Sequence, residues 1–118
     1  MVSLEKILVG KLLSRMRIIS GKYRGKQIQF FKSLTTRPLK DSVKENIFNI
    51  ISHSKLTNVK IENSHILDLY SGVGSFGIEC ISRGAKKVYF VDQDLNACQK
   101  LNENLKNLRI QKKFKTRI

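Results

Sequence analysis

Two carboxylates and a glycine-rich turn are the residues of this chain best suited to chemistry. Segment 66–77 reads Ile-Leu-Asp-Leu-Tyr-Ser-Gly-Val-Gly-Ser-Phe-Gly, an apolar run that ends in a Gly-x-Gly-x-x-Gly pattern. Asp68 lies four residues before the first glycine, and Asp92 lies twenty residues after it, at the end of the next apolar run. A strand, a glycine turn and a helix start, followed by an acid at this distance, favour a site for a nucleotide-like cofactor.

Asp68 narrows the choice of cofactor. A dinucleotide carries a pyrophosphate, which a helix N-terminus stabilises, and a carboxylate beside that anion would be unfavourable. S-adenosylmethionine has no phosphate, and a carboxylate would stabilise its positive ammonium and sulfonium groups directly or through water. Asp92 would hold two ribose hydroxyls in either case. The sequence therefore favours S-adenosylmethionine, although Asp68 could instead be a turn acid that only caps backbone N–H groups.

The residues around the turn complete the candidate site. Glycines let a ligand approach the backbone closely, and the aromatic residues that flank the turn could contact the cofactor or belong to the core. The candidate cofactor-binding residues are Asp68, Tyr70, Gly72, Gly74, Phe76 and Asp92. Cys80 and Cys98 are predicted to be buried thiols, because neither has the CxxC or His spacing that predicts a metal site.

An alternation of strands and helices must position these residues. We predict a strand over 66–70, a helix over 75–83 that Gly84 ends, a strand over 88–91, and a helix from about Leu95 that Asp94 caps. The last helix should lie on a sheet through Leu95, Cys98, Leu101, Leu105 and Leu108. Residues 111–118 could start a third strand. Such an alternation predicts parallel pairing and a ligand at the carboxyl ends of the strands.

The N-terminal half has a different pattern. Residues 16–31 are predicted to form a β-hairpin whose turn lies between Gly21 and Gly25, and residues 33–39 a loop that contains the only proline. A capping box at Ser42-x-x-Glu45 should open a helix that ends near His53. Its predicted buried residues are Val43, Ile47, Phe48, Ile50 and Ile51. Residues 1–15 are either a short helix or an extension upstream of a start at Met16.

The charge of the chain favours a polyanionic partner. Its 118 residues contain 23 Lys and Arg against 9 Asp and Glu, a net charge of +14. Such an excess is typical of nucleic-acid binding, although a generally basic proteome would give it too. The hairpin is basic without a single acid, so its side chains either follow phosphates or form a solvated polar face. The candidates for RNA contact here are Arg17, Lys22, Arg24 and Lys26.

Composition also limits the class of protein. With 41% apolar residues the chain should fold as one small domain. The apolar residues near the N-terminus are too few and too interrupted for a membrane span or a signal peptide. We therefore expect a cytoplasmic monomer with no metal and no membrane partner.

Several motifs together resemble one family. They are Met16–Gly25, Thr36-Arg37-Pro38, Asp41–Ile50, Asp68–Gly77, Ser82–Ala85 and Phe90–Asp92. They resemble the bacterial 16S ribosomal RNA guanine-N2 methyltransferases. The resemblance implies an α/β fold, in which an N-terminal β-hairpin and helix precede a Rossmann-like class I methyltransferase sheet. It also implies S-adenosylmethionine as cofactor and the N2 amine of a guanine in 16S rRNA, in the small ribosomal subunit, as substrate.

The same resemblance suggests roles for individual residues. Asp68, Gly72 and Gly74 would line the methionine part of the cofactor, and Asp92 would hold its ribose. The basic hairpin and Arg37 would face RNA. We therefore expect an N-terminal extension over 1–15, a hairpin, loop and helix over 16–64, and an incomplete cofactor domain over 65–118.

The chain departs from the family in one respect. These enzymes carry an Asp/Asn-Pro-Pro-aromatic motif that orients the target amine and stacks on the extruded base. This chain has one proline, Pro38, so we expect the N-terminal part only, without catalytic residues and without turnover. A frameshift or premature stop, or deliberate shortening, would explain this. We also expect the sheet edge after residues 88–91 to be left unpaired or poorly covered. The alternatives are a non-catalytic RNA- or cofactor-binding remnant and a fragment of a dinucleotide-dependent oxidoreductase.

Overall fold

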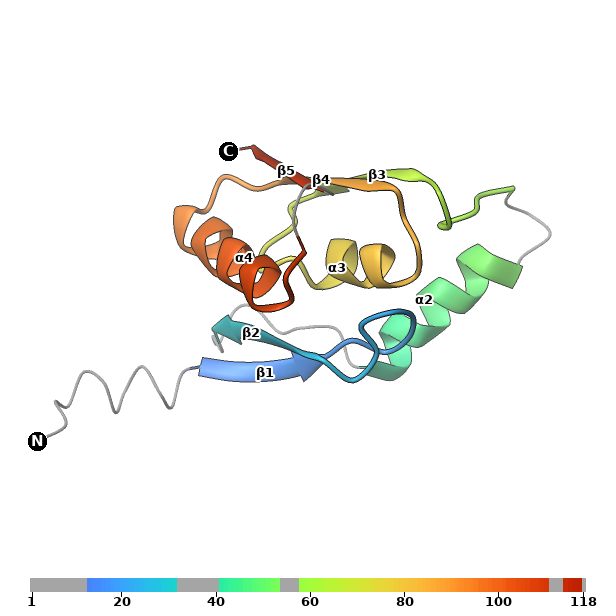
Figure 1. The fold of residues 1–118 in the computed structure, drawn as a ribbon, viewed down its shortest axis with the longest axis horizontal. Coiled ribbons are helices and arrows are strands. Elements are labelled where there is room, and N and C mark those ends of the chain that lie inside the picture. Colours follow the sequence, from blue (N-terminus) through green and yellow to red (C-terminus); the bar gives the residue numbers. More distant parts are fainter. Residues whose placement is uncertain (1–12, 32–40, 54–57, 111–113, 118) are drawn as a thin grey trace, which may run out of the picture.

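The computed structural model describes residues 13–31, 41–53, 58–110 and 114–117. The chain forms three layers (Figure 1). A sheet lies on one side, two helices lie beneath it, and a β-hairpin lies beneath the helices, with a further helix beside the hairpin. The fold is α/β, as predicted.

The hairpin pairs β1 (Leu13–Arg17) with β2 (Gln27–Phe31) in antiparallel register, which confirms the prediction. β1 begins at Leu13, within the segment expected to precede the hairpin. Gly21 and Gly25 have φ of +92° and +82° in the turn. A Cβ on Gly21 would lie 1.9 Å from the carbonyl oxygen of Ser82. Gly21 therefore lets the hairpin turn lie directly against the helix that carries Ser82.

Helix α2 (Asp41–His53) begins one residue before the predicted cap, so Ser42 lies in its first turn. The predicted buried stripe is wrong in part. Val43 and Ile50 are exposed, whereas Lys44 and Phe48 are buried. The face of α2 that is buried differs from the predicted one, because Lys44 forms a buried ion pair with Glu79, which lies within residues 75–82 of the neighbouring helix. The loop over 33–39, with Arg37, lies outside the described residues.

The sheet has three parallel strands in the order β3 (His65–Leu69), β4 (Lys87–Val91) and β5 (Phe114–Arg117). Parallel pairing is confirmed, with Leu69 opposite Val91. The expectation that the edge after residues 88–91 is unpaired is wrong, because β5 pairs with β4 on the side away from β3. Among the described strands, the open edges belong to β3 and β5.

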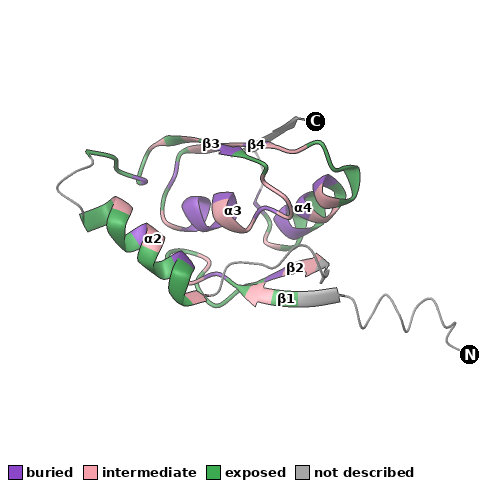
Figure 2. Cartoon of the chain, turned by 180° about the vertical axis from the view of Figure 1, so that it is seen from behind, coloured by how far each residue is buried: buried purple, intermediate pink, exposed green. Residues whose placement is uncertain are grey.

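Helices α3 (Ser75–Ser82) and α4 (Leu95–Asn107) cover one face of the sheet. Every residue of α3 from Gly77 to Ser82 is buried, because the sheet lies on one side of this helix and the hairpin on the other (Figure 2). In α4, Cys98, Leu101 and Leu105 are buried as predicted, but Leu95 is exposed at the first position of the helix. Cys80 and Cys98 are free, buried thiols, as predicted.

The opposite face of the sheet is bare in the part of the chain that the structure describes. Leu67 and Leu69 point to this face and are 62% and 57% exposed. None of the described helices combines the length and the apolar character needed to cross a bilayer.

Candidate cofactor-binding site

The glycine turn joins the end of β3 to the start of α3 and is held against β4. The Ser71 N–H donates to the carbonyl of Val91 at 3.0 Å, and the Gly74 N–H donates to the carbonyl of Ser71 at 2.9 Å. Gly72 has a φ of +55°, and no atom lies within 4 Å of the place where its Cβ would be. The backbone of the turn at Gly72 therefore faces open space.

Asp68 is buried under the turn, with 8% of its surface exposed. Its Oδ2 accepts a hydrogen bond from the Gly77 N–H at 3.1 Å, within the first turn of α3. The N-cap residue, Gly74, has no side chain to make such a bond, so Asp68 caps the helix from the neighbouring strand. Asp68 therefore caps α3 through Oδ2, and its Oδ1 receives no hydrogen bond from the described residues.

The surroundings of Asp68 disfavour its charged form. Burial raises the pKa of this carboxyl to about 6, and the nearby charge of Asp92 also raises it, while the hydrogen bond from Gly77 lowers it. A buried acid beside a helix start whose pKa is displaced this far is a candidate for a functional site.

Gly77 allows Asp68 to reach the helix. A Cβ at this position would lie 2.2 Å from Cε1 of Phe90 and 2.9 Å from Oδ2 of Asp68. Gly74 has a related role, because its Cβ would lie 2.2 Å from Cδ1 of Leu101. These two glycines of the pattern are therefore needed for packing, and Gly72 is the one that faces open space.

Asp92 links the end of β4 to the turn. Its Oδ2 accepts from the Gly72 N–H and its Oδ1 from the Asp94 N–H, both at 2.8 Å. Each carboxylate oxygen can accept a second hydrogen bond, so hydroxyl donors can still bind. The hydroxyl of Ser71 is buried and has no hydrogen-bond partner among the described residues. A free carboxylate oxygen, an unpartnered hydroxyl and an open glycine backbone fit a cationic, hydroxyl-rich cofactor such as S-adenosylmethionine.

The two aromatic candidates differ in their surroundings. Tyr70 has a φ of +57° and is 86% exposed at the turn. Phe76 stacks on Phe48 of α2, with ring centroids 4.9 Å apart. One face of Phe76 thus packs against α2, whereas Tyr70 is free to contact a ligand.

A buried ionic cluster, which the sequence analysis missed, holds the hairpin against α3. Glu79 is fully buried and pairs with Lys44 Nζ at 3.2 Å and Arg83 Nε at 2.9 Å. It also accepts from the backbone N–H groups of Ile19 at 2.8 Å and Ser20 at 3.1 Å. In the sequence, the one indication that Glu79 is buried was its position inside the apolar run Ile-Glu-Cys-Ile.

Asn104 makes a second link between the hairpin and the site. Its Oδ1 accepts from the Gln29 N–H at 2.9 Å. Its Nδ2 donates to the carbonyls of Gln29 at 2.9 Å and Val73 at 3.1 Å. Since Val73 lies inside the glycine turn, one buried amide joins β2, α4 and the turn. One feature of the sequence indicated this role, namely that Asn104 is a polar residue directly before Leu105, which belongs to the apolar stripe of α4.

Four of the five candidate RNA-contacting residues lie in or beside the hairpin turn, and the fifth, Arg37, lies outside the described residues. Lys22, Arg24 and Lys26 are exposed in and beside the hairpin turn. Arg17 is exposed at the end of β1, and its Nε pairs with Oδ2 of Asp41 at 3.1 Å. Within the described ranges, no group of three or more His, Cys, Asp or Glu residues could hold a metal ion.

Comparisons with known proteins agree with the resemblance noted from the motifs. The family model described as Conserved hypothetical protein 95 matches residues 16–118. Ribosomal RNA small subunit methyltransferase D of Haemophilus influenzae is 36% identical over 106 residues, which are 90% of this chain and 52% of the relative. The protein of the same name from Escherichia coli K12 is 32% identical over 95 residues, which are 80% of this chain and 45% of the relative.

Solved structures give the same result for the fold. HI0767 from Haemophilus influenzae, 33% identical, has a TM-score of 0.61 over 89% of this chain and 51% of its own. yhhF from Escherichia coli, 27% identical, has a TM-score of 0.69 over 87% of this chain and 51% of its own. The chain thus spans about half the length of the relatives it matches. Since one family model matches residues 16–118, the chain belongs to the family described as Conserved hypothetical protein 95, together with relatives named ribosomal RNA small subunit methyltransferase D.

Proposed function

We propose that this chain is the cofactor-binding part of a methyltransferase that uses S-adenosylmethionine to methylate the N2 amine of a guanine in 16S ribosomal RNA. The observation that carries the proposal is the carboxylate of Asp68, which is buried under an open glycine turn and whose Oδ1 has no partner among the described residues. A buried anion at this place suits a cation, and it does not suit the pyrophosphate of a dinucleotide.

The proposed roles follow from the contacts at the turn. Asp68 would hold the ammonium of the cofactor, while Gly72 and Gly74 line its methionine part. Asp92, fixed by two backbone N–H groups, would accept hydrogen bonds from the ribose hydroxyls. Tyr70 would cover the cofactor, and Phe76 would border it with the edge of its ring. S-adenosylmethionine supplies the transferable methyl group, and these residues bind and orient it.

The proposed RNA partner rests on charge. The net charge is +14, and Lys22, Arg24 and Lys26 are exposed around one hairpin turn. These side chains would contact the RNA, as would Arg37 and, through its outer N–H groups, Arg17, and Lys22 and Lys26 would contact its phosphates. The hairpin is joined to the cofactor turn through Asn104, so RNA and cofactor would bind one continuous unit. We further propose a monomer that works in the cytoplasm and has no turnover as this chain alone.

Calorimetric titration tests the proposed cofactor. S-adenosylmethionine should bind the chain and NAD should not. Asp68→Asn should weaken S-adenosylmethionine about 10- to 100-fold, because it removes a charged hydrogen-bond partner. Glu103→Gln is the matched control, since it removes one exposed carboxylate from α4 and should leave the affinity unchanged.

Three results would contradict parts of this proposal. Binding of NAD in place of S-adenosylmethionine would favour the oxidoreductase alternative. Salt-dependent RNA binding without any cofactor binding would favour an RNA-binding remnant, which the charge of the hairpin also supports. Methylated guanine in small-subunit RNA that was incubated with the purified chain and cofactor would show that the chain has turnover.

A further inference from the structure

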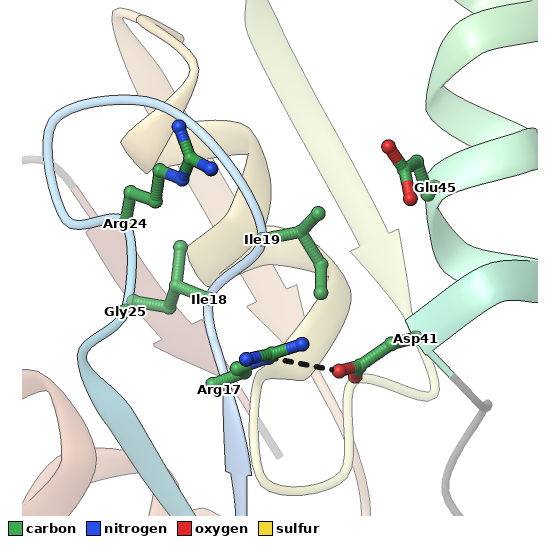
Figure 3. Close-up of a pocket in the computed structure, with 7 residues that line it drawn as sticks. All are labelled: Arg17, Ile18, Ile19, Arg24, Gly25, Asp41 and Glu45. Carbon is green, nitrogen blue, oxygen red and sulfur yellow. Dashed lines mark hydrogen bonds and ion pairs between the residues drawn. The ribbon is translucent and has the colours of Figure 1, made fainter.

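A cavity of about 240 Å³ lies between the hairpin turn and the start of α2 (Figure 3). The residues around it are Arg17, Ile18, Ile19, Arg24, Gly25, Asp41 and Glu45. None of them is a candidate for cofactor binding. The cavity is smaller than the pockets of about 300–1,000 Å³ that hold drug-sized ligands, so its size suits one aromatic base rather than a whole nucleotide cofactor.

The charges around the cavity are balanced but not all paired. Arg17 and Asp41 form an ion pair at one end. Arg24, from the hairpin, and Glu45, from α2, lie on opposite sides with Ile19 between them (Figure 3). Neither Arg24 nor Glu45 has a side-chain hydrogen bond or ion pair with any residue that the structure describes. The cavity therefore offers donors on one side, acceptors on the other and an apolar floor.

This arrangement excludes some ligands and favours others. A phosphate group would meet Glu45 and Asp41 as well as the arginines, and two carboxylates oppose an anion. An uncharged, planar ligand fits if one edge carries acceptors and another carries donors. Guanine has adjacent acceptors at O6 and N7, which an arginine binds with two hydrogen bonds. It also has adjacent donors at N1 and N2, which match the two oxygens of a carboxylate.

The other bases match less well. Adenine presents one donor beside one acceptor on its N6/N7 edge, and uracil has no two adjacent acceptors. Cytosine has adjacent acceptors at N3 and O2, but it has no adjacent pair of donor nitrogens like N1 and N2 of guanine. We propose that the cavity between the hairpin and α2 binds one guanine of the RNA. In that complex Arg24 reads O6 and N7, Glu45 reads N1 and N2, and Ile19 packs on the base. The inference rests on the proposed function in one respect, namely that RNA is the partner.

Fluorescence anisotropy with short labelled RNA tests this inference. The probes are single-stranded oligouridines with one central guanosine, inosine or 7-deazaguanosine. Inosine lacks only the N2 amine, and 7-deazaguanosine lacks only N7. The unaltered chain should bind the guanosine probe about five- to tenfold more tightly than either analogue, since one well-placed contact to a base gives at least this discrimination.

Variants connect the discrimination to the cavity. Glu45→Ala should abolish the preference for guanosine over inosine, and its fold should be retained because Ala is a strong helix former at an exposed position. Arg24→Ala should abolish the preference for guanosine over 7-deazaguanosine. Lys22→Ala, in the same hairpin turn but outside the cavity, is the matched control, and it should weaken all three probes equally.

The outcomes separate this inference from the proposed function. Equal binding of all three probes by the unaltered chain would overturn the guanine site and leave the proposed RNA partner intact. A preference that survives Glu45→Ala would also overturn it. Failure to bind any probe at low salt would overturn both the guanine site and the RNA partner, whereas the titration with S-adenosylmethionine would still test the cofactor separately.

Discussion

Glu79→Gln should lower the free energy of unfolding by about 3 to 5 kcal/mol, the usual cost of breaking a buried ion pair by removing one partner. Lys44 and Glu79 have side-chain exposures of 3% and 0%, so water cannot replace the lost charge. The substitution also replaces an acceptor of two backbone N–H groups from the hairpin. Since domains of this size are stable by about 5–15 kcal/mol, the variant should be only marginally folded.

Urea unfolding followed by circular dichroism measures this effect. Glu103→Gln breaks an ion pair whose carboxylate is 57% exposed and should cost no more than about 1 kcal/mol. The double variant Lys44→Met, Glu79→Gln should be more stable than Glu79→Gln alone, because it no longer buries an unpaired ammonium. A double variant less stable than Glu79→Gln would show that the unpaired charge is not the cause.

The affinity for S-adenosylmethionine should rise with pH up to about pH 6 and then level off. The pKa of Asp68 is raised to about 6, so this carboxyl is mostly neutral at pH 5 and charged at pH 7. If the charged form binds the cofactor, the affinity should fall about tenfold for each unit below pH 6. Calorimetry between pH 4.5 and pH 7.5 measures this dependence, and Asp68→Asn should remove it.

The same carboxyl should affect stability in the opposite direction. Its pKa in the folded chain is higher than the ordinary value of 3.8, so the folded chain holds this proton more tightly than the unfolded chain does. The stabilising contribution is therefore complete below about pH 4 and is lost as the pH rises through 6. Asp68→Asn should be more stable than the unaltered chain at pH 7 although it binds the cofactor less well, a trade-off typical of functional sites.

An affinity for S-adenosylmethionine that does not change between pH 4.5 and pH 7.5 would contradict a role for the Asp68 charge in binding.

The parts of the fold that depend on local sequence could be predicted. Gly84 ends α3, and the side chain of Asp94 caps α4 by accepting from the N–H groups of Asn96 and Ala97, as expected. The alternating strands and helices also predicted the parallel sheet. It follows that Asp68 and Asp92 both lie beside the glycine turn. These features depend on residues close together in the chain and on the handedness of crossovers, both of which a sequence shows.

The features that depend on distant partners could not be predicted. Val43 and Ile50 fit an apolar stripe on α2, yet Lys44 is buried there because Glu79, thirty-five residues later, supplies its charge partner. Asn104 is buried because Gln29 and Val73 use all its polar atoms. A buried polar residue is recognisable only when its partners are known. The exposure of Leu67 and Leu69 on the bare face of the sheet was likewise not visible in the sequence, because it depends on how distant segments pack.

The glycine amides offer the most direct test of the cofactor site. The chain has seven glycines, and three of them lie in or beside the turn at 72, 74 and 77. In a ¹H–¹⁵N correlation spectrum, S-adenosylmethionine should shift Gly72 and Gly74 strongly and Gly77 through its hydrogen bond to Asp68, while Gly25 in the hairpin turn stays unchanged. Shifts confined to the hairpin, or no shift at millimolar cofactor, would contradict the assignment of this turn as the site of the methyl donor.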